Sequence, residues 1–147
     1  MLPLSVQKFH KYEMEQNYKE VAEALGIYNL GNKYPSEISG GQQQRTAAAR
    51  AFVHKPTIIF ADEPTGALDS KSAQDLLHRL EDMNKQFNST IMMVTHDPSA
   101  ASYAERVIML KDGDIHSEIY QGNDSKQTFY QEIMKLQTAL GGVSHDI

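Results

Sequence analysis

Up to about residue 55, hydrophobic side chains recur with a helical period, whereas beyond it short continuous apolar runs alternate with helical patterns. Over residues 11–25 they recur every three or four positions, which predicts an amphipathic helix. Gly26 suits the left-handed residue that often ends such a helix. A second, alanine-rich helix is expected over about residues 41–54, with Ser39 as its N-cap. The pattern therefore predicts a helical subdomain over residues 1–55.

Beyond residue 55, short continuous apolar runs alternate with helical patterns, and such runs are typical of strands covered on both faces. Strands are expected over residues 57–61, 90–94, 106–110 and 115–120. Helices are expected over residues 70–87, 98–104 and 125–140. Asp112-Gly113 predicts a two-residue hairpin turn between the last two strands. Strands that alternate with helices imply an α/β sheet with right-handed crossovers, which we assign to residues 56–147.

Composition and charge narrow the classes of function. The 147 residues suit one domain or the larger part of one, with 40% hydrophobic and 22% charged residues, an ordinary globular mixture. The formal charge of −5 gives no reason to expect a nucleic-acid partner. The absence of cysteine excludes a disulfide scaffold and a thiolate zinc site. Apolar runs are far shorter than the about 20 residues of a membrane span, so we expect no direct membrane insertion.

A glycine pair opens the second expected helix, within the stretch Ile38–Arg45. A helix that begins with Ser39-Gly40-Gly41 presents unpaired N–H groups and the positive end of its dipole. Glycines let an anion approach the backbone closely, and Ser39 can add a hydroxyl. Taken alone, the segment is more often a loop and a helix cap, because short motifs frequently match by chance. Only the residues further along the chain can decide between the two interpretations.

Two adjacent carboxylates, Asp62 and Glu63, follow an apolar strand, at the end of the strand where open α/β sheets bind ligands. One carboxylate there can help to hold Mg²⁺, and a second can act as a general base or orient an attacking water. Pro64 is expected to push Glu63 towards an extended backbone. The alternative is that these residues only end a strand and start a turn. Asp69 and His96 also follow strand or turn signals, where a capping role is the plainer interpretation.

Taken in order, these pieces resemble the C-terminal half of an ATP-binding cassette (ABC) ATPase. They are the stretch Ile38–Arg45, the run Ile58–Ser70, and Val94-Thr95-His96-Asp97. The resemblance covers essentially all 147 residues and departs at Ile38, where the family's signature motif usually has Leu. It implies a partial P-loop NTPase fold of the ABC ATPase type. In that fold a helical subdomain precedes the C-terminal part of a mainly parallel sheet core.

The resemblance also implies roles for individual residues. The signature motif and the D-loop would bind nucleotide through Ser39, Gly40, Gly41, Gln42 and Asp69. Asp62 resembles the Walker B aspartate, which would bind Mg²⁺ through water. Glu63 and His96, which resembles the switch histidine, would be the catalytic residues. The implied cofactors are ATP and Mg²⁺.

The C-terminal segments narrow the resemblance to a subgroup. Residues 119–122 (Ile-Tyr-Gln-Gly) and 140–146 are similar to the ATPases of bacitracin-type peptide-antibiotic resistance transporters. This implies an ATP-hydrolysing subunit of an exporter of antimicrobial peptides. Such a subunit would form a dimer with a second ABC ATPase subunit. A membrane permease subunit would hold it at the cytoplasmic face of the cell membrane.

No G-x-x-x-x-G-K-[ST] phosphate loop occurs in the 147 residues. We therefore expect a truncated product or a fragment that is inactive as an ATPase by itself, because the phosphate loop supplies most phosphate contacts in this class. Two alternatives stay open. One is a non-catalytic interaction module that pairs with an intact ABC ATPase. The other is a soluble ABC protein of DNA repair or translation.

Overall fold

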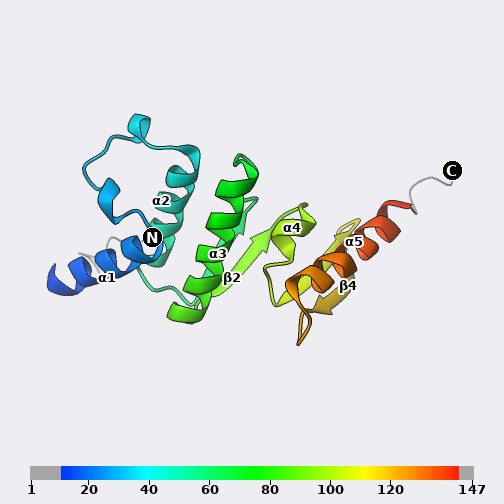
Figure 1. Cartoon of the computed structure of the whole chain (residues 1–147). Coiled ribbons are helices and arrows are strands. Elements are labelled where there is room, and N and C mark those ends of the chain that lie inside the picture. The colour runs from blue at the N-terminus through cyan, green and yellow to red at the C-terminus, as the bar shows by residue number, and fades with distance from the viewer. Residues whose placement is uncertain (1–10, 143–147) are drawn as a thin grey trace. The chain divides into compact units, whose positions relative to one another are not determined.

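The computed structural model describes residues 11–142, and its contacts divide the chain into two compact units between Met93 and Val94 (Figure 1). The first unit holds the early helices and one pair of strands, and the second holds a hairpin and the last helix. The expected division at residues 55 and 56, into a helical subdomain and the remainder of the core, stays a prediction.

The first unit begins with helices, as the periodicity predicts. Helix α1 spans Lys11–Ala24 and helix α2 spans Gly40–Phe52. Between them lie two short 3₁₀ turns, η1 (Tyr28–Leu30) and η2 (Pro35–Glu37). Gly26 has a φ of +66°, so the left-handed end of α1 is confirmed.

A strand–helix–strand segment completes the first unit. Strand β1 (Ile58–Asp62), helix α3 (Ser70–Phe87) and strand β2 (Thr90–Val94) follow one another, and β1 pairs with β2. Figure 1 shows α2 and α3 as neighbours beside these strands. One core joins the helices to β1, and its buried side chains are Val21, Ala22, Leu25, Ile27, Phe52, Ile59, Leu76, Leu80 and Met83. Burial of these apolar side chains is the main force that holds the unit together.

The strands of this unit are not covered on both faces, so that expectation is wrong for the described residues. Ile59 is buried against the helices, whereas Ile58 and Phe60 on the opposite face are 44% and 72% exposed. Met92 on β2 is 50% exposed. Successive side chains of a strand point to opposite faces, and within the described part of this unit only the Ile59 side meets helices. The continuous apolar run of β1 therefore supplies side chains to one buried face and one exposed face of the strand.

The second unit contains helix α4 (Pro98–Ala101), strands β3 (Arg106–Lys111) and β4 (Asp114–Tyr120), and helix α5 (Lys126–Gly142). The strands form an antiparallel hairpin in which Lys111 pairs with Asp114. Asp112 and Gly113 have φ values of +53° and +88°, as a tight primed turn requires, so the predicted hairpin turn is confirmed. Helix α5 packs on α4 and β3, and it buries Phe129 and Ile133. Helix α4 is shorter than expected, because it ends at Ala101 and residues 102–104 form turns instead.

Within residues 11–142, no helix combines the length and the apolar character that crossing a membrane would require.

Candidate functional site

The predicted cap of α2 is a complete capping box. The Gln42 backbone N–H donates to Ser39 Oγ at 3.2 Å, and the Ser39 N–H donates to Gln42 Oε1 at 2.9 Å. These two bonds fix the backbone on either side of Gly40 and Gly41. The first N–H groups of an α-helix have no partner within the helix, and the dipole adds partial positive charge there. Ser39 and Gly40 are exposed, so this end of α2 is open to an anion.

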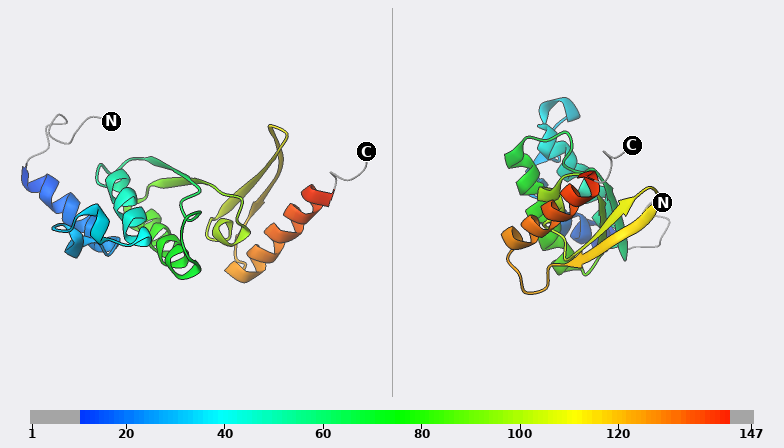
Figure 2. Two further views of the ribbon diagram at one scale, coloured as in Figure 1. Left: turned by 90° about the horizontal axis from the view of Figure 1, so that it is seen from above. Right: turned by 90° about the vertical axis from the view of Figure 1, so that its right-hand side faces the viewer.

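The N-terminal end of α3 lies directly beside that of α2. A Cβ atom on Gly41 would lie 3.2 Å from Ser72 Oγ, and one on Gly40 would lie 3.8 Å from Leu68 Cδ2. Gly41 therefore has no room for a side chain unless Ser72 moves, whereas Gly40 has ordinary clearance. Figure 2 shows α2 and α3 side by side. The structure thus brings the glycine pair into contact with the start of α3.

Asp69 is the N-cap of α3. Its carboxylate accepts hydrogen bonds from the Ser72 N–H at 2.8 Å and from the Ser72 hydroxyl at 3.0 Å. The backbone bond from Ser72 is the main cause that holds the pKa of Asp69 below its ordinary value, with the Ser72 hydroxyl bond second. Asp69 is exposed, and its lowered pKa keeps the carboxylate ionised at neutral pH. Through Ser72 it is linked to Gly41, so five residues expected to bind nucleotide lie around two adjacent helix ends.

Asp62 and Glu63 lie where β1 ends, as expected, but the backbone of Glu63 is not extended. Its φ is +44°, in the left-handed region that disfavours residues with a side chain. The Glu63 carbonyl accepts a hydrogen bond from the Gly66 N–H at 3.1 Å, and the Thr65 carbonyl accepts one from the Leu68 N–H at 3.1 Å. Two successive turns thus lead from β1 to the cap of α3. Glu63 therefore does not follow the usual preference of a residue before proline for extended backbone.

The residues present fit Mg²⁺ as a partly hydrated ion. Asp62 is an exposed carboxylate at a strand end, and no group of three or more possible ligands occurs within residues 11–142. Mg²⁺ usually takes one or two carboxylates, several waters and substrate phosphates rather than a protein cage. Asp62 alone is compatible with that mode of binding.

His96 belongs to the second unit, in the loop that follows β2. The Gln137 side chain on α5 donates from Nε2 to the His96 carbonyl at 3.1 Å. Asp97 caps α4 by accepting a hydrogen bond from the Ser99 N–H at 2.8 Å. The loop around His96 is thereby held by both helices of its own unit. Gln137 lies 41 residues away, and no local signal in the sequence points to its contact with this loop.

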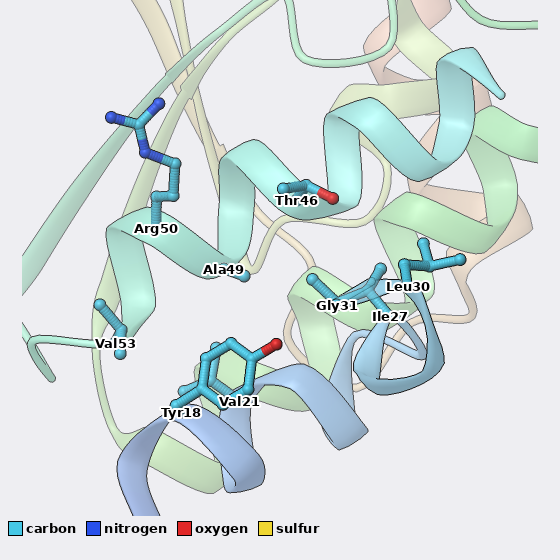
Figure 3. A pocket seen from close by; sticks show the side chains of 9 residues that line it. All are labelled: Tyr18, Val21, Ile27, Leu30, Gly31, Thr46, Ala49, Arg50 and Val53. Atoms are coloured by element: carbon cyan, nitrogen blue, oxygen red, sulfur yellow. The ribbon is translucent and has the colours of Figure 1, made fainter. Parts of the chain in front are cut away.

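A pocket of about 180 Å³ lies elsewhere, between α1 and α2 (Figure 3). The residues that line it are Tyr18, Val21, Ile27, Leu30, Gly31, Thr46, Ala49, Arg50 and Val53. It is smaller than the about 300 to 1,000 Å³ usual for small-molecule sites. None of its lining residues is among those expected to bind nucleotide.

Comparison with known proteins decides the family. A family model described as "ABC transporter" matches residues 3–66. The bacitracin export ATP-binding protein BceA of Halalkalibacterium halodurans is 58% identical over 146 residues, which are 99% of this chain and 58% of that protein. The chain belongs to the ABC transporter ATP-binding family. The ABC transporter ATP-binding protein YxdL of Bacillus subtilis is 48% identical over 147 residues, which are 100% of this chain and 57% of that protein.

Solved ABC structures share the fold. The dimeric structure of MJ0796, a bacterial ABC transporter cassette, has a TM-score of 0.63 and 39% identity, and the match covers 76% of this chain and 49% of that chain. The structure of cbiO1 from Clostridium perfringens, part of the ABC transporter complex cbiONQ, has a TM-score of 0.75 and 26% identity over 94% of this chain and 55% of that chain. The partial ABC-type fold is thus confirmed. The chain spans a little over half the length of the curated relatives BceA and YxdL.

These comparisons establish ATP binding and ATP hydrolysis at the level of the ABC family. MJ0796 has also been solved in a dimeric post-hydrolysis state bound to ADP and Pi. Dimers therefore occur among the structural neighbours of this chain.

Proposed function

We propose that this ABC chain belongs to the ATP-binding, ATP-hydrolysing subunit of an exporter that removes antimicrobial peptides, and that the 147 residues lack the phosphate-loop half of that subunit. The observation that carries the proposal is its 58% identity to a bacitracin export ATP-binding protein over 99% of the chain. A macrolide export ATP-binding/permease protein, MacB of Psychrobacter cryohalolentis, is 55% identical over 66% of the chain. Relatives named for export favour an exporter over an ABC protein of DNA repair.

The paired helix ends would present the signature face to a nucleotide held by a second ABC ATPase subunit. Ser39, Gly40, Gly41 and Gln42 would offer N–H groups and a hydroxyl to phosphate oxygens. The dipole of α2 favours negative charge at this point, and neither glycine carries a Cβ that would keep a phosphate away. Asp69, beside them, would lie in the same interface.

The residues at the C-terminal end of β1 would act on a nucleotide bound by the subunit to which this chain belongs. When bound, Mg²⁺ would neutralise charge on the phosphates, and Asp62 would hold it through water. Glu63 would accept a proton from the attacking water or orient that water. His96 would contact the γ-phosphate. The left-handed backbone of Glu63 supports the proposal, because unfavourable backbone conformations of this kind cluster at active sites.

We further propose that the 147-residue chain does not hydrolyse ATP by itself, because no phosphate loop occurs in it. A permease subunit would hold the assembly at the cytoplasmic face of the membrane. The alternative function, a non-catalytic module that pairs with an intact ATPase, is favoured by one observation. The five residues that would form the signature face (Ser39, Gly40, Gly41, Gln42 and Asp69) all lie in the first unit, around two adjacent helix ends.

A mixing experiment with an intact ATPase of the bacitracin-export type tests the site. Light scattering should show pairing that depends on Mg-ATP. Ser39→Arg and Gly40→Asp should abolish it by placing bulk or negative charge at the phosphate position. Gly40 is a better choice than Gly41, because its Cβ position has ordinary clearance and α3 is left undisturbed.

Glu63→Gln is the matched control for this experiment. It should pair normally, because the nucleotide is held by the partner and meets only the signature face of this chain. If Glu63→Gln disrupts pairing as strongly as Ser39→Arg does, the chain itself engages nucleotide and this one-sided arrangement is wrong.

Growth tests distinguish a peptide exporter from an ABC protein of DNA repair. Loss of the coding sequence should sensitise the source cells to bacitracin-class peptides and leave their sensitivity to DNA damage unchanged. The reverse result would replace the exporter with the DNA-repair alternative.

A further inference from the structure

An ion cluster joins α1, α2 and α3 one helical turn below the paired helix ends. Arg45 on α2 donates from Nη1 to Asp75 Oδ2 on α3 at 2.6 Å. Arg79, also on α3, donates from Nε to both carboxylate oxygens of Asp75 at 3.2 Å. Its Nη1 donates to the Ala24 carbonyl at the end of α1, at 3.0 Å. We call Arg45, Asp75, Arg79 and this carbonyl the Asp75 cluster.

The Asp75 cluster is built into the packing of the unit. The Arg45 side chain is only 15% exposed, and Asp75 is its partner in both a hydrogen bond and an ion pair. A Cβ atom on Gly26 would lie 2.8 Å from Arg79 Nη1, so the guanidinium fills the space of an absent side chain. A largely buried arginine depends strongly on its carboxylate, because the charge has lost most of its contact with water.

The Asp75 cluster is in register with the candidate site. Arg45 follows Gly41 by four residues and Asp75 follows Ser72 by three, so each pair lies on one face of its helix. The Gly41–Ser72 contact and the Arg45–Asp75 ion pair are therefore successive contacts across the same helix interface. Arg45 Nη1 also lies 3.8 Å from the Cβ position of Gly41. A slide of α2 along α3 would change both contacts together.

We propose that Asp75 is the positioning residue of the signature face. Its carboxylate holds Arg45, and Arg45 holds the start of α2 against the cap of α3, so that Ser39 and Asp69 face the same nucleotide. The statement that Ser39 and Asp69 face a nucleotide rests on the proposed function. The restraint that Asp75 and Arg45 place on α2 and α3 does not depend on that function. By contrast, the exposed Lys85–Glu81 pair joins two residues of the same helix, α3.

Spin labels measure the restraint directly, because the chain has no cysteine of its own. Ala47 on α2 and Gln74 on α3 are exposed, so Ala47→Cys with Gln74→Cys provides two labelling sites in the full chain. The variants to compare are Asp75→Asn, Asp75→Glu, Arg45→Gln and the control Lys85→Gln. Arg45→Gln leaves Asp75 paired with Arg79, so it remains informative if Asp75→Asn fails to fold.

Electron paramagnetic resonance should show one narrow distance in the parent and in Lys85→Gln. Asp75→Asn and Arg45→Gln should lose the narrow distance while circular dichroism still shows folded helices. Asp75→Glu should restore it, because the longer carboxylate can still reach Arg45. Nucleotide-dependent pairing with the intact ATPase should weaken about tenfold in the first two variants.

The two proposals fail in different ways. If Arg45→Gln keeps the narrow distance of the parent, Asp75 does not position the helices, whatever the pairing assay shows. If the parent never pairs with the ATPase but Asp75→Asn and Arg45→Gln lose the narrow distance, the positioning role stands and the proposed function is wrong.

Discussion

The left-handed backbone of Glu63 makes possible a stability measurement that separates backbone strain from side-chain chemistry. Glu63→Ala and Glu63→Gly both remove the carboxylate, so their difference reports the backbone at a φ of +44°. A left-handed conformation costs an L-residue roughly 1–2 kcal/mol, and glycine avoids that cost. In the opposite direction, glycine lowers the free energy of unfolding by about 0.4–1 kcal/mol, because its unfolded chain has more conformational freedom to lose. We therefore expect Glu63→Gly to unfold with a free energy about 0.5–1 kcal/mol above that of Glu63→Ala.

Urea denaturation of the full chain, followed by circular dichroism, measures this difference. In thermal unfolding it corresponds to about 4–8 °C per kcal/mol for a unit of the size of residues 1–93. Gln74, exposed in α3, is the matched control, because right-handed helical backbone reverses the sign. There Ala should be more stable than Gly by about 1 kcal/mol. Equal stabilities of the two Glu63 variants, with the control behaving as stated, would refute the strained turn.

Three further changes have defined outcomes. Phe60→Thr should reduce aggregation of the isolated chain in light scattering, because it removes the most exposed apolar side chain of β1 without touching the helix-covered face. In denaturation curves measured over a series of pH values, the free energy of unfolding of Asp69→Asn should fall less steeply at acidic pH than that of the parent chain. The lowered pKa of Asp69 stabilises the fold above the ordinary aspartate pKa of about 3.9, and this contribution is lost as the pH falls through the folded pKa. Calorimetry of the chain with Mg-ATP should detect no binding tighter than about 1 mM, or about −4 kcal/mol.

Most elements could be predicted because their signals are local. Asp112-Gly113 requires positive φ at both turn positions, and the structure has it. Ser39 is followed three residues later by Gln42, which is the spacing of a capping box. Gly26 ends α1 for the same kind of reason. In each case two to four neighbouring residues suffice to fix the conformation.

The features that could not be predicted depend on residues far apart in the chain. The tight contact of Gly41 with Ser72 and the pairing of Arg45 with Asp75 join residues about 30 positions apart. A sequence pattern shows that both helices exist but not which faces meet. The i,i+4 spacing of Asp75 and Arg79 is the local signal that bears on the Asp75 cluster, and it says nothing of Arg45.

The exposed face of β1 and the turn at Glu63 have a different cause. A run of apolar residues does not tell whether one or two layers cover a strand, so the pattern places Phe60 inside although it is exposed. The rule for residues before proline describes a preference, and Glu63 does not follow it.

The core of the first unit also sets an order of events during synthesis on the ribosome. Leu76, Leu80 and Met83 on α3 fill the core beside residues of α1 and α2, and the ring of Phe87 lies tilted beside that of Phe52, with 6.0 Å between the ring centroids. The two earlier helices therefore leave the exit tunnel with uncovered apolar faces. About 30 further residues must be translated before α3 can cover them, which takes about 2 to 6 seconds at about 5 to 20 residues per second. We expect a ribosome-bound chaperone to bind these apolar faces in that interval, and synonymous codons that slow translation between α2 and α3 should lengthen their exposure.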